Sequence, residues 1–541
     1  MTIEITPFSA VLKSNTNPLN TTKVASEFQK VRKYEKAIKK LLEGRDAAYF
    51  NDRFETETSS LVGDPNEVYL KTLAIRRKIE SENYMVNTIN SVFEVNWGRF
   101  AREPGSGVGN IEPSISAIES LKAGITPANI ISYNAPGGSP EGRCAIATIY
   151  NTSIDPEMAL NTSKIFGPEN IALTNGATEA LSVAINSIYK ILPEPKAGSM
   201  KKASIILPSY YTLPLSVKSA GFEVIDLSKP KDVDFVRSYF PSLQDIKDTL
   251  PKESLLVLTL PNNPNGEDFS DNFLKGLFLW AKNNGVIIVI DQLFDSLYFS
   301  KNKSTPNPIK IGKETGSLDN IVFIYGFAKS TNVAGTRTGS IATTNSKIMK
   351  EINRSLLERR CTSNLTQTFF YQFEALAKII DQEQGVKSIK AIKQRLEKNT
   401  GFNWLKGISL QTLDNWYIER KKWNEEVIKY YRNNLTVIQF CLDYFEKRGR
   451  TIIRSPDEAG YNTLVTIKSL GQNNGFDKIA KTALTTGIVP MNIQSFGLSN
   501  NISEDTFRLT YGGIRQEEIP QILARLLAFN EVYENRLGYL I

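Results

Sequence analysis

The chain contains short segments whose residue types and spacing could bind a ligand and react with it. In ALTNGATEAL (172–181), a strand pattern leads into a turn of small residues and then into a helix start. Gly176, Ala177 and Thr178 at this turn could present backbone N–H groups and one hydroxyl to an anion, helped by the helix dipole. Tyr210 in PSYYTLP follows another strand pattern, where its ring could stack on a flat ligand. These two segments offer an anion cradle and an aromatic ring.

Three later segments also place polar side chains at the ends of expected strands. Asn263 in LTLPNNPNGEDFS could donate its amide N–H to an oxyanion. Asp291 ends the run VIIVID, and open α/β sheets bind ligands at the carboxyl ends of their strands. Lys329 follows NIVFIYGFA, and Arg337 comes eight residues after it. Each feature alone is typical of a cap, a turn or a solvated side chain, but five such strand ends together indicate one ligand site.

The elements that must position these residues follow from the hydrophobic pattern. Between about residues 165 and 345, short aliphatic runs alternate with helical patterns. The runs are ASIILP, FEVIDL, LLVLTL, VIIVID and NIVFIYG. Continuous aliphatic runs separated by helices are typical of buried parallel strands in an α/β domain. Nearer the C-terminus, GYNTLVTIKS and TFRLTYGG are expected strands among helices, which predicts a small α+β lobe.

Composition excludes several classes of function. The 541 residues are 41% hydrophobic and 23% charged, as in a soluble globular protein of two or three lobes. The chain has no histidine, and its three cysteines lack metal or redox spacing, so no metal site and no His-based catalysis are expected. The formal net charge of +8 is mild, and no signal peptide or membrane span is apparent. We expect a cytoplasmic protein without nucleic-acid or membrane partners.

The order of these motifs resembles one known family. N-P-N-G is followed by Asp291 28 residues after Asn263, then by A-K-S with G-x-R-x-G, and finally by F-R-L. From roughly Asn96 to the C-terminus, the chain is similar to the fold-type-I pyridoxal-phosphate enzymes, specifically the class I/II aminotransferase family. The resemblance implies an α/β aminotransferase-like fold, with a large α/β domain around a mixed, mostly parallel sheet, a small α+β domain and a helical N-terminal extension.

Domain boundaries are expected as follows. Residues 1–95 form the helical N-terminal extension, 96–164 the first part of the aminotransferase fold, 165–345 the large cofactor-binding domain, 346–381 an interdomain helix, 382–422 a helical insertion and 423–541 the small C-terminal domain. The extension and the insertion exceed the family's usual core. They are either structural additions, or a lid and oligomer surface that reshape the pocket.

The resemblance also implies a role for each site residue. Lys329 would form a Schiff base with pyridoxal 5′-phosphate, Asp291 would keep the pyridine nitrogen protonated, and Tyr210 would stack on the ring. Asn263 would bind the ring 3′-oxygen, and the phosphate would be held at the cradle and by Arg337. The implied cofactor-binding set is Gly176, Ala177, Thr178, Tyr210, Asn263, Asp291, Phe294, Lys329, Ser330, Arg337 and Tyr133.

Other residues are implied to bind the substrate or to reach another subunit. Arg508 matches the arginine that pairs with a substrate α-carboxylate, a task suited to its planar fork. Asn96, Trp97 and Gly98 fall where substrate-covering residues begin. Tyr133 matches a tyrosine that reaches a neighbouring subunit's phosphate, so a homodimer or a higher homo-oligomer is expected.

Two positions depart from the family pattern. Phe294 stands three residues after Asp291, where the family usually has a tyrosine, so a hydroxyl donor to the ring 3′-oxygen is missing. Gly326 stands three residues before Lys329, where a Ser or Thr phosphate ligand is common, and Ser330 is the candidate replacement.

The motif set favours an aminotransferase that acts on an amino acid with a free α-carboxylate. A non-transaminating enzyme on the same fold (a decarboxylase, lyase, cyclase or oxidase) is the alternative, because Phe294 and the extra segments alter the pocket. A ligand-sensing domain behind an N-terminal DNA-binding module is a third possibility. Residues 1–90 carry 14 basic and 12 acidic side chains, a near balance that argues against this third reading.

Overall fold

The structure is a computed structural model that describes Leu61 and, with gaps, residues 111–523. The gaps are 128, 130–132, 134, 162–163, 211, 229–239, 299–305, 359–366, 383–387, 448–451, 456–458, 468–490, 498–505, 513, 517–518 and 520–521. Apart from Leu61, the predicted N-terminal extension lies outside the described residues. Asn96, Trp97 and Gly98 also lie outside them.

The larger lobe is built on a seven-stranded sheet of order β1-β7-β6-β5-β4-β2-β3. Its strands are β1 (Ile171–Asn175), β2 (Lys202–Ile205), β3 (Glu223–Asp226), β4 (Leu255–Thr259), β5 (Ile287–Asp291), β6 (Ile321–Tyr325) and β7 (Thr338–Ala342). Neighbouring strands pair in parallel except at β7, which is antiparallel to both β1 and β6. The mixed, mostly parallel sheet is therefore confirmed, and the five aliphatic runs form β2 to β6.

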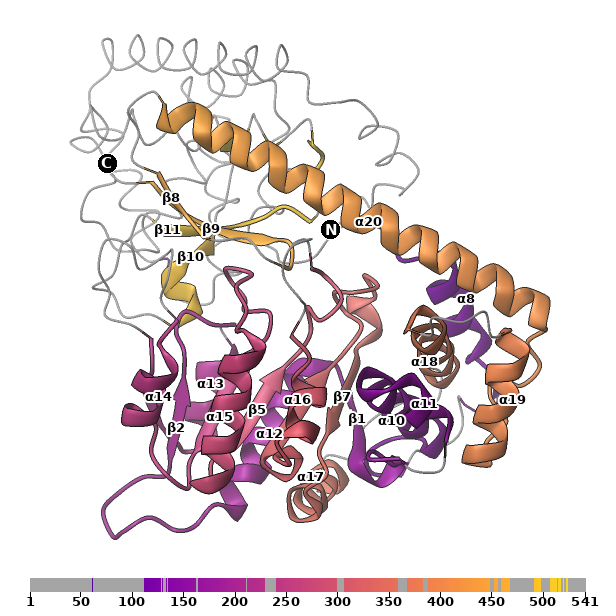
Figure 1. The fold of residues 1–541 in the computed structure, drawn as a ribbon, viewed down its shortest axis with the longest axis horizontal. Coiled ribbons are helices and arrows are strands. Elements are labelled where there is room, and N and C mark those ends of the chain that lie inside the picture. The colour runs from indigo at the N-terminus through magenta and orange to yellow at the C-terminus, as the bar shows by residue number, and fades with distance from the viewer. Residues whose placement is uncertain are drawn as a thin grey trace.

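Helices cover this sheet (Figure 1). Those of the sheet region are α12 (Ala177–Ile191), α13 (Thr212–Ser219), α14 (Leu243–Thr249), α15 (Asp271–Asn283), α16 (Pro308–Glu314) and α17 (Ser346–Glu358). A second group consists of α8 (Ile115–Ala123), α10 (Pro140–Ile154), α11 (Pro156–Leu160), α18 (Thr368–Gln382) and α19 (Ile389–Thr400). In this group α10 packs against α18 and β1. Short 3₁₀ turns occur at Pro168–Asn170, Leu318–Asn320, Ala334–Thr336 and Ile493–Phe496.

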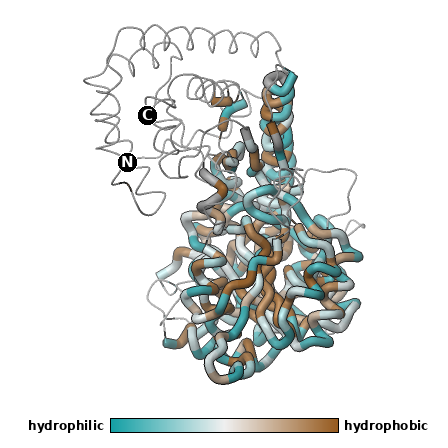
Figure 2. Tube along the Cα trace, turned by 90° about the vertical axis from the view of Figure 1, so that its left-hand side faces the viewer, coloured by the Kyte–Doolittle hydropathy of each residue, from teal (hydrophilic) through white to brown (hydrophobic). Residues whose placement is uncertain are grey.

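The core of the large lobe follows from strand composition. Every residue of β4 and β5 is buried, as expected for parallel strands covered on both faces. Figure 2 shows the corresponding apolar segments running through the interior of this lobe. Such burial holds the strand ends in fixed positions, and the polar residues that follow the strands are fixed with them.

The smaller lobe contains a four-stranded antiparallel sheet of order β10-β11-β9-β8. Its strands are β8 (Ile452–Arg454), β9 (Asn462–Ile467), β10 (Met491–Asn492) and β11 (Thr506–Thr510). The two strands expected from GYNTLVTIKS and TFRLTYGG are β9 and β11. They pair directly, which places Arg508 opposite Leu464 in the centre of the sheet.

A 37-residue helix, α20 (Leu410–Glu446), joins the two lobes (Figure 1). It contains no proline or glycine and runs unbroken through the boundary expected between residues 422 and 423. The segment 346–381, expected as the interdomain helix, instead holds α17 and most of α18. Helical periodicity alone could not show which of these helices crosses between the lobes.

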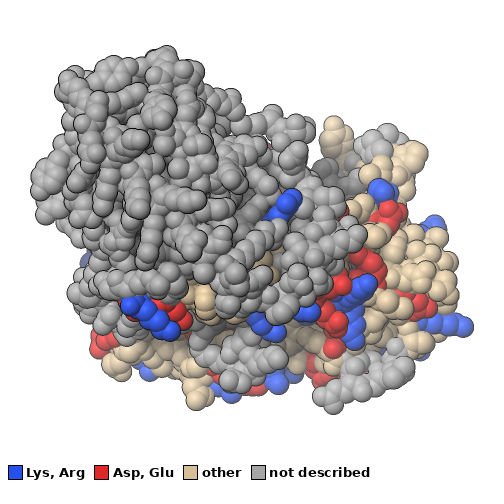
Figure 3. Space-filling view, turned by 90° about the horizontal axis from the view of Figure 1, so that it is seen from above, with Lys and Arg blue, Asp and Glu red and all other residues tan. Residues whose placement is uncertain are grey.

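Acidic and basic side chains lie beside one another on the described part of the face in Figure 3. Among the described helices, none has the length and apolar composition needed to cross a membrane.

Candidate active site

The anion cradle expected at Gly176 lies at the start of α12. Gly176 is the N-cap of this helix with φ +83°, and in the described part of the chain no side-chain cap is formed at this helix start. A Cβ at Gly176 would lie 2.6 Å from Nη2 of Arg337, so the guanidinium lies directly against this turn. Nη2 of Arg337 also donates to the backbone oxygen of Asn175 at 3.3 Å. The helix N-terminus and a cation therefore face the same small space, an arrangement suited to a phosphate.

Close backbone contacts bring these groups together. A Cβ at Gly339 would lie 2.4 Å from the carbonyl carbon of Gly176, so only glycine lets β7 approach the cradle. A Cβ at Gly326 would lie 2.7 Å from the backbone oxygen of Thr338. A serine or threonine at Gly326 would push β7 away in this chain.

Asn263 and Arg508 meet across the two lobes. Nη1 of Arg508 donates to Oδ1 of Asn263 at 3.1 Å, and both side chains are buried. Because Oδ1 accepts from the guanidinium, the amide Nδ2 keeps its two N–H donors for another partner. The guanidinium also lies over the ring of Phe496, 5.0 Å from its centroid. Asn263 is thus held with its amide nitrogen directed away from Arg508.

Asp291 and Lys329 form the electrostatic centre of the site. Burial raises the pKa of Asp291 to about 7, against the opposing effects of the backbone N–H of Leu293 and the charge of Lys329. Burial and the charge of Arg508 lower the pKa of Lys329 to about 8, Asp291 acts in the opposite direction, and Arg337 lowers the pKa further. A cationic ring nitrogen beside Asp291 would favour the ionised carboxylate.

The aromatic residues expected at the site occupy different positions. Tyr210 is partly buried just before α13, and the preceding Ser209 donates its N–H to the backbone oxygen of Phe496. Phe294 is buried and packs edge-on against Tyr461, with ring centroids 5.4 Å apart. Phe496 thus connects the Tyr210 segment to Arg508, while Phe294 belongs to an aromatic cluster.

Two other expected residues lie apart from this group of contacts. Tyr133 is fully exposed, at 101% of its reference area. Ser330 lines a cavity with Asp295 and Lys378, and its buried Oγ has no hydrogen-bond partner in the described part of the chain.

Some residues of the site were missed by sequence reasoning. Gly339 could have been found, since it is the last residue of the G-T-R-T-G motif around Arg337. Phe496 and Tyr461 had no such signal, because their positions depend on how the small lobe folds back onto the large one.

The groups described fit pyridoxal phosphate. The uncapped helix start with Arg337 matches the phosphate, and adding a Cβ at Gly176 would fill the cradle. Asp291 matches a protonated pyridine nitrogen, and the amide of Asn263 matches an anionic ring oxygen. Lys329 supplies an amine whose lowered pKa favours its reactive, neutral form.

Comparison with known proteins matches most of this chain to a family. The family model described as aminotransferase class I and II matches residues 109–526. The chain is 29% identical over 226 residues to the aspartate aminotransferase of Thermotoga maritima. The aligned segment covers 40% of this chain and 53% of that protein. It is also 26% identical over 223 residues to the aspartate aminotransferase of Thermococcus kodakarensis. The aligned segment covers 41% of this chain and 48% of that protein. The chain thus spans about half the length of these curated relatives.

Solved structures show the same fold. The aspartate aminotransferase from Thermus thermophilus with maleate is similar at a TM-score of 0.58 and 16% identity, covering 84% of this chain and 98% of that one. The aspartate aminotransferase from Rhizobium meliloti is similar at a TM-score of 0.58 and 13% identity, covering 87% and 97%. At such low identity the similarity concerns the fold.

Proposed function

Because the chain belongs to the class I and II aminotransferase family, we propose that it is a pyridoxal-phosphate-dependent aminotransferase acting on an amino acid with a free α-carboxylate. The observation that supports this most is the grouping of Asp291, Lys329, Arg337 and Arg508, in which Arg508 reaches the large lobe at Asn263 and Arg337 lies against the start of α12. These four residues come from or just after β5, β6 and β11 and from the turn before β7. A group of charged residues assembled from separate strands and the loops beside them is characteristic of an active site.

The cofactor site is proposed as follows. When bound, pyridoxal phosphate supplies an aldehyde that condenses with amines and a ring that withdraws electrons from the bond to be broken. The start of α12 and Arg337 hold the phosphate, and Tyr210 covers the ring. Asp291 keeps the ring nitrogen protonated, and Asn263 donates to the ring oxygen.

Lys329 serves first as the attachment point and then as the base. With a pKa lowered to about 8, a substantial fraction of its side chain is neutral near pH 7.5, so the amine can attack a carbonyl carbon. Once displaced by the substrate amine, the same Nζ can take the proton from the substrate Cα and return it elsewhere. The chain has no histidine that could do this.

Arg508 is proposed to hold the substrate. Its Nη1 is already directed at Asn263, which fixes the guanidinium plane at the junction of the two lobes. A carboxylate that accepts two parallel N–H bonds from this plane would present Cα to Lys329.

A non-transaminating reaction is the second candidate, and the position of Phe294 favours it. The Phe294 ring packs against Tyr461 and supplies no hydroxyl to the cofactor, unlike the usual family tyrosine. A changed hydrogen bond to the ring oxygen alters the pKa of the groups attached to the ring, and with it the electron demand of the ring.

We further propose a homodimer or higher homo-oligomer located in the cytoplasm. The fully exposed Tyr133 supports a contact to a second subunit, because its ring covers no other part of the described chain. The extension 1–95 and the insertion 382–422 are proposed to shape a lid or the oligomer surface.

Incubation with a panel of amino acids, without any keto acid, tests the proposed reaction. An aminotransferase leaves the cofactor as its amine form and releases one keto acid per site. Regeneration of the aldehyde form with release of carbon dioxide or ammonia would instead establish the second candidate. The substrate that gives the fastest spectral change identifies the amino acid.

A further inference from the structure

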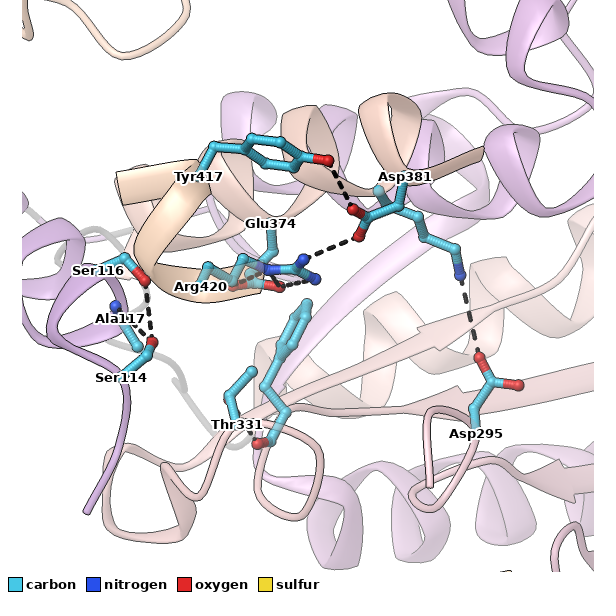
Figure 4. A network of polar contacts seen from close by, with 11 residues as sticks. Ser114, Ser116, Ala117, Asp295, Thr331, Glu374, Asp381, Tyr417 and Arg420 are labelled. Atoms are coloured by element: carbon cyan, nitrogen blue, oxygen red, sulfur yellow. Dashed lines mark hydrogen bonds and ion pairs between the residues drawn. The ribbon is translucent and has the colours of Figure 1, made fainter. Parts of the chain in front are cut away.

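A network of polar side chains between α18 and α20 is satisfied within the protein. Nε of Arg420 donates to both carboxylate oxygens of Glu374 at 3.1 and 3.0 Å, and its Nη1 donates to Asp381 at 2.9 Å. The hydroxyl of Tyr417 donates to the other oxygen of Asp381 at 3.0 Å (Figure 4). These contacts hold α20 to α18, and the network needs no ligand.

Asn462, at the start of β9, is only partly satisfied. Its Oδ1 accepts a hydrogen bond from the hydroxyl of Thr510 at 2.8 Å, whereas its Nδ2 has no hydrogen-bond partner among the residues that the structure describes. The residue is 3% exposed, yet Nδ2 is not one of the fully enclosed atoms that lack a partner, so it keeps some accessible surface. An amide nitrogen carries two N–H donors. Asn462 can therefore donate to an acceptor that enters from open space.

The register of the small-lobe sheet places Asn462 on the same face as Arg508. Asn462 lies opposite Thr510, and Leu464 lies opposite Arg508, where β9 pairs with β11. Opposite residues of antiparallel strands point to the same face, and so do residues two apart along one strand. Asn462 and Arg508 are thus diagonal neighbours, with Cα atoms roughly 7–8 Å apart. A side chain as long as arginine spans such a diagonal, so both residues can reach the same small ligand.

The start of β9 lies against the large lobe close to the candidate active site. A Cβ at Gly266, the last residue of the N-P-N-G turn, would lie 2.2 Å from the backbone oxygen of Ala459. A Cβ at Gly460 would lie 3.6 Å from Cδ1 of Phe294. These contacts place the start of β9, and Asn462 with it, beside the loops that follow β4 and β5.

The amide of Asn462 is oriented in the same way as that of Asn263. Each accepts through Oδ1, from Thr510 and from Arg508 respectively, and keeps Nδ2 for another partner. A carboxylate has about four acceptor positions, of which two parallel N–H bonds from a guanidinium use two. An amide beside the guanidinium can donate to a third.

We propose that Asn462 is a further substrate-binding residue, whose Nδ2 donates to the α-carboxylate of the amino acid beside Arg508. This inference rests on the proposed function, in which Arg508 holds that carboxylate. A second donor on the same sheet face fixes the carboxylate from another direction, so that Cα keeps one orientation toward Lys329.

Binding of sodium acetate to the full-length chain, incubated with pyridoxal phosphate, tests this inference. Acetate carries a carboxylate without an amino group, so it cannot condense with the cofactor, and NMR of its methyl signal gives a Kd whatever reaction the enzyme catalyses. Asn462→Leu removes the donors at similar volume and should weaken acetate binding about tenfold. Asn415→Leu, at an exposed position of α20, is the matched control and should leave the affinity unchanged.

Asn462→Asp keeps the acceptor for Thr510, and it replaces Asn462→Leu if that variant does not fold. It should weaken acetate binding more than Asn462→Leu does, because a second carboxylate would repel the ligand. Titration of pyridoxal phosphate by absorbance should give an unchanged Kd for Asn462→Leu. A weaker cofactor affinity with unchanged acetate affinity would overturn the inference, because the amide would then serve the cofactor.

Arg508→Lys separates failure of this inference from failure of the proposed function. We expect this variant to weaken acetate binding as well. If it does so while both Asn462 variants bind acetate normally, the inference is overturned and the proposed function stands. If neither Arg508→Lys nor the Asn462 variants weaken acetate binding, the inference and the proposed role of Arg508 are both overturned.

Discussion

Arg508 determines which way the amide of Asn263 faces. Its Nη1 donates to Oδ1 of Asn263 at 3.1 Å, and its guanidinium lies over Phe496. A lysine has one point charge in place of a planar fork, so it cannot hold this amide and a substrate carboxylate at once.

Arg508→Lys should therefore raise KM for the amino acid about tenfold to a hundredfold and change the Kd of pyridoxal phosphate much less. Steady-state kinetics and cofactor titration measure the two quantities. Arg354→Lys, an exposed arginine on α17, is the control. The unaltered chain should prefer amino acids to amines that lack a carboxylate. Loss of this preference in the Arg508→Lys variant would support the assignment, and an unchanged preference would contradict it.

Asp291 makes the stability of the cofactor-free protein depend on pH. Its folded pKa is raised to about 7 from the ordinary value of 3.8. Between these values the folded state holds a proton that the unfolded chain has released, so stability falls as pH rises from about 4 to 7.

Asp291→Asn cannot ionise and should lose less stability across this range. At neutral pH the variant should be more stable than the cofactor-free wild type by on the order of 4 kcal/mol at most, with little difference near pH 4. Urea unfolding at both pH values measures this, with Asp414→Asn, which removes an exposed carboxylate on α20, as the control. An equal fall in stability for Asp291→Asn and the wild type would show that the carboxyl is not the group responsible.

At the scale of elements, the approach of β7 to the start of α12 shapes the candidate phosphate site. A Cβ at Gly339 would lie 2.4 Å from the backbone of Gly176 and would force the two elements apart. Gly335 lies in the 3₁₀ turn just before β7, and a Cβ there would meet nothing within 4 Å.

Gly339→Ala should destabilise the protein by about 1–3 kcal/mol and weaken pyridoxal phosphate binding, because Arg337 moves with β7. Gly335→Ala should do neither. Thermal unfolding and cofactor titration on the two variants provide the comparison. Normal cofactor affinity in Gly339→Ala would mean that this contact does not position the cradle.

The elements were predictable to different degrees. The aliphatic runs predicted β2 to β6. Every position of β4, β5 and β6 is buried, and a strand covered on both faces favours apolar residues along its length. The edge strand β3 was predicted from the same pattern although it is only partly buried. The path of α20 was not predictable, since a run of helical residues does not show what its two ends contact. Arg508 and Asn263 are 245 residues apart in sequence, so their hydrogen bond depends on the packing of two lobes. Likewise, the uncapped start of α12 was expected, but the glycine contacts around it were not.

At the scale of the whole molecule, the candidate active site lies at the junction of the two lobes, where Arg508 contacts Asn263. The large lobe contributes Asp291, Lys329 and Arg337 from strand ends, and the small lobe contributes Arg508 from β11. Helix α20 connects the lobes along its 37 residues, and its Arg420 is held to α18 by Glu374 and Asp381. A site assembled from two lobes needs both to be folded before it can bind cofactor and substrate together.

Covalent attachment of pyridoxal phosphate to Lys329 is the most direct test of this account. The purified chain is incubated with pyridoxal phosphate and reduced with borohydride, and its peptides are analysed by mass spectrometry. Attachment should quicken as the pH rises through about 8, because the neutral amine is the reacting form. The account predicts one pyridoxyl group per chain on the peptide that contains Lys329, and none in Lys329→Ala. A label distributed over surface lysines, with Lys329 unmodified, would contradict it.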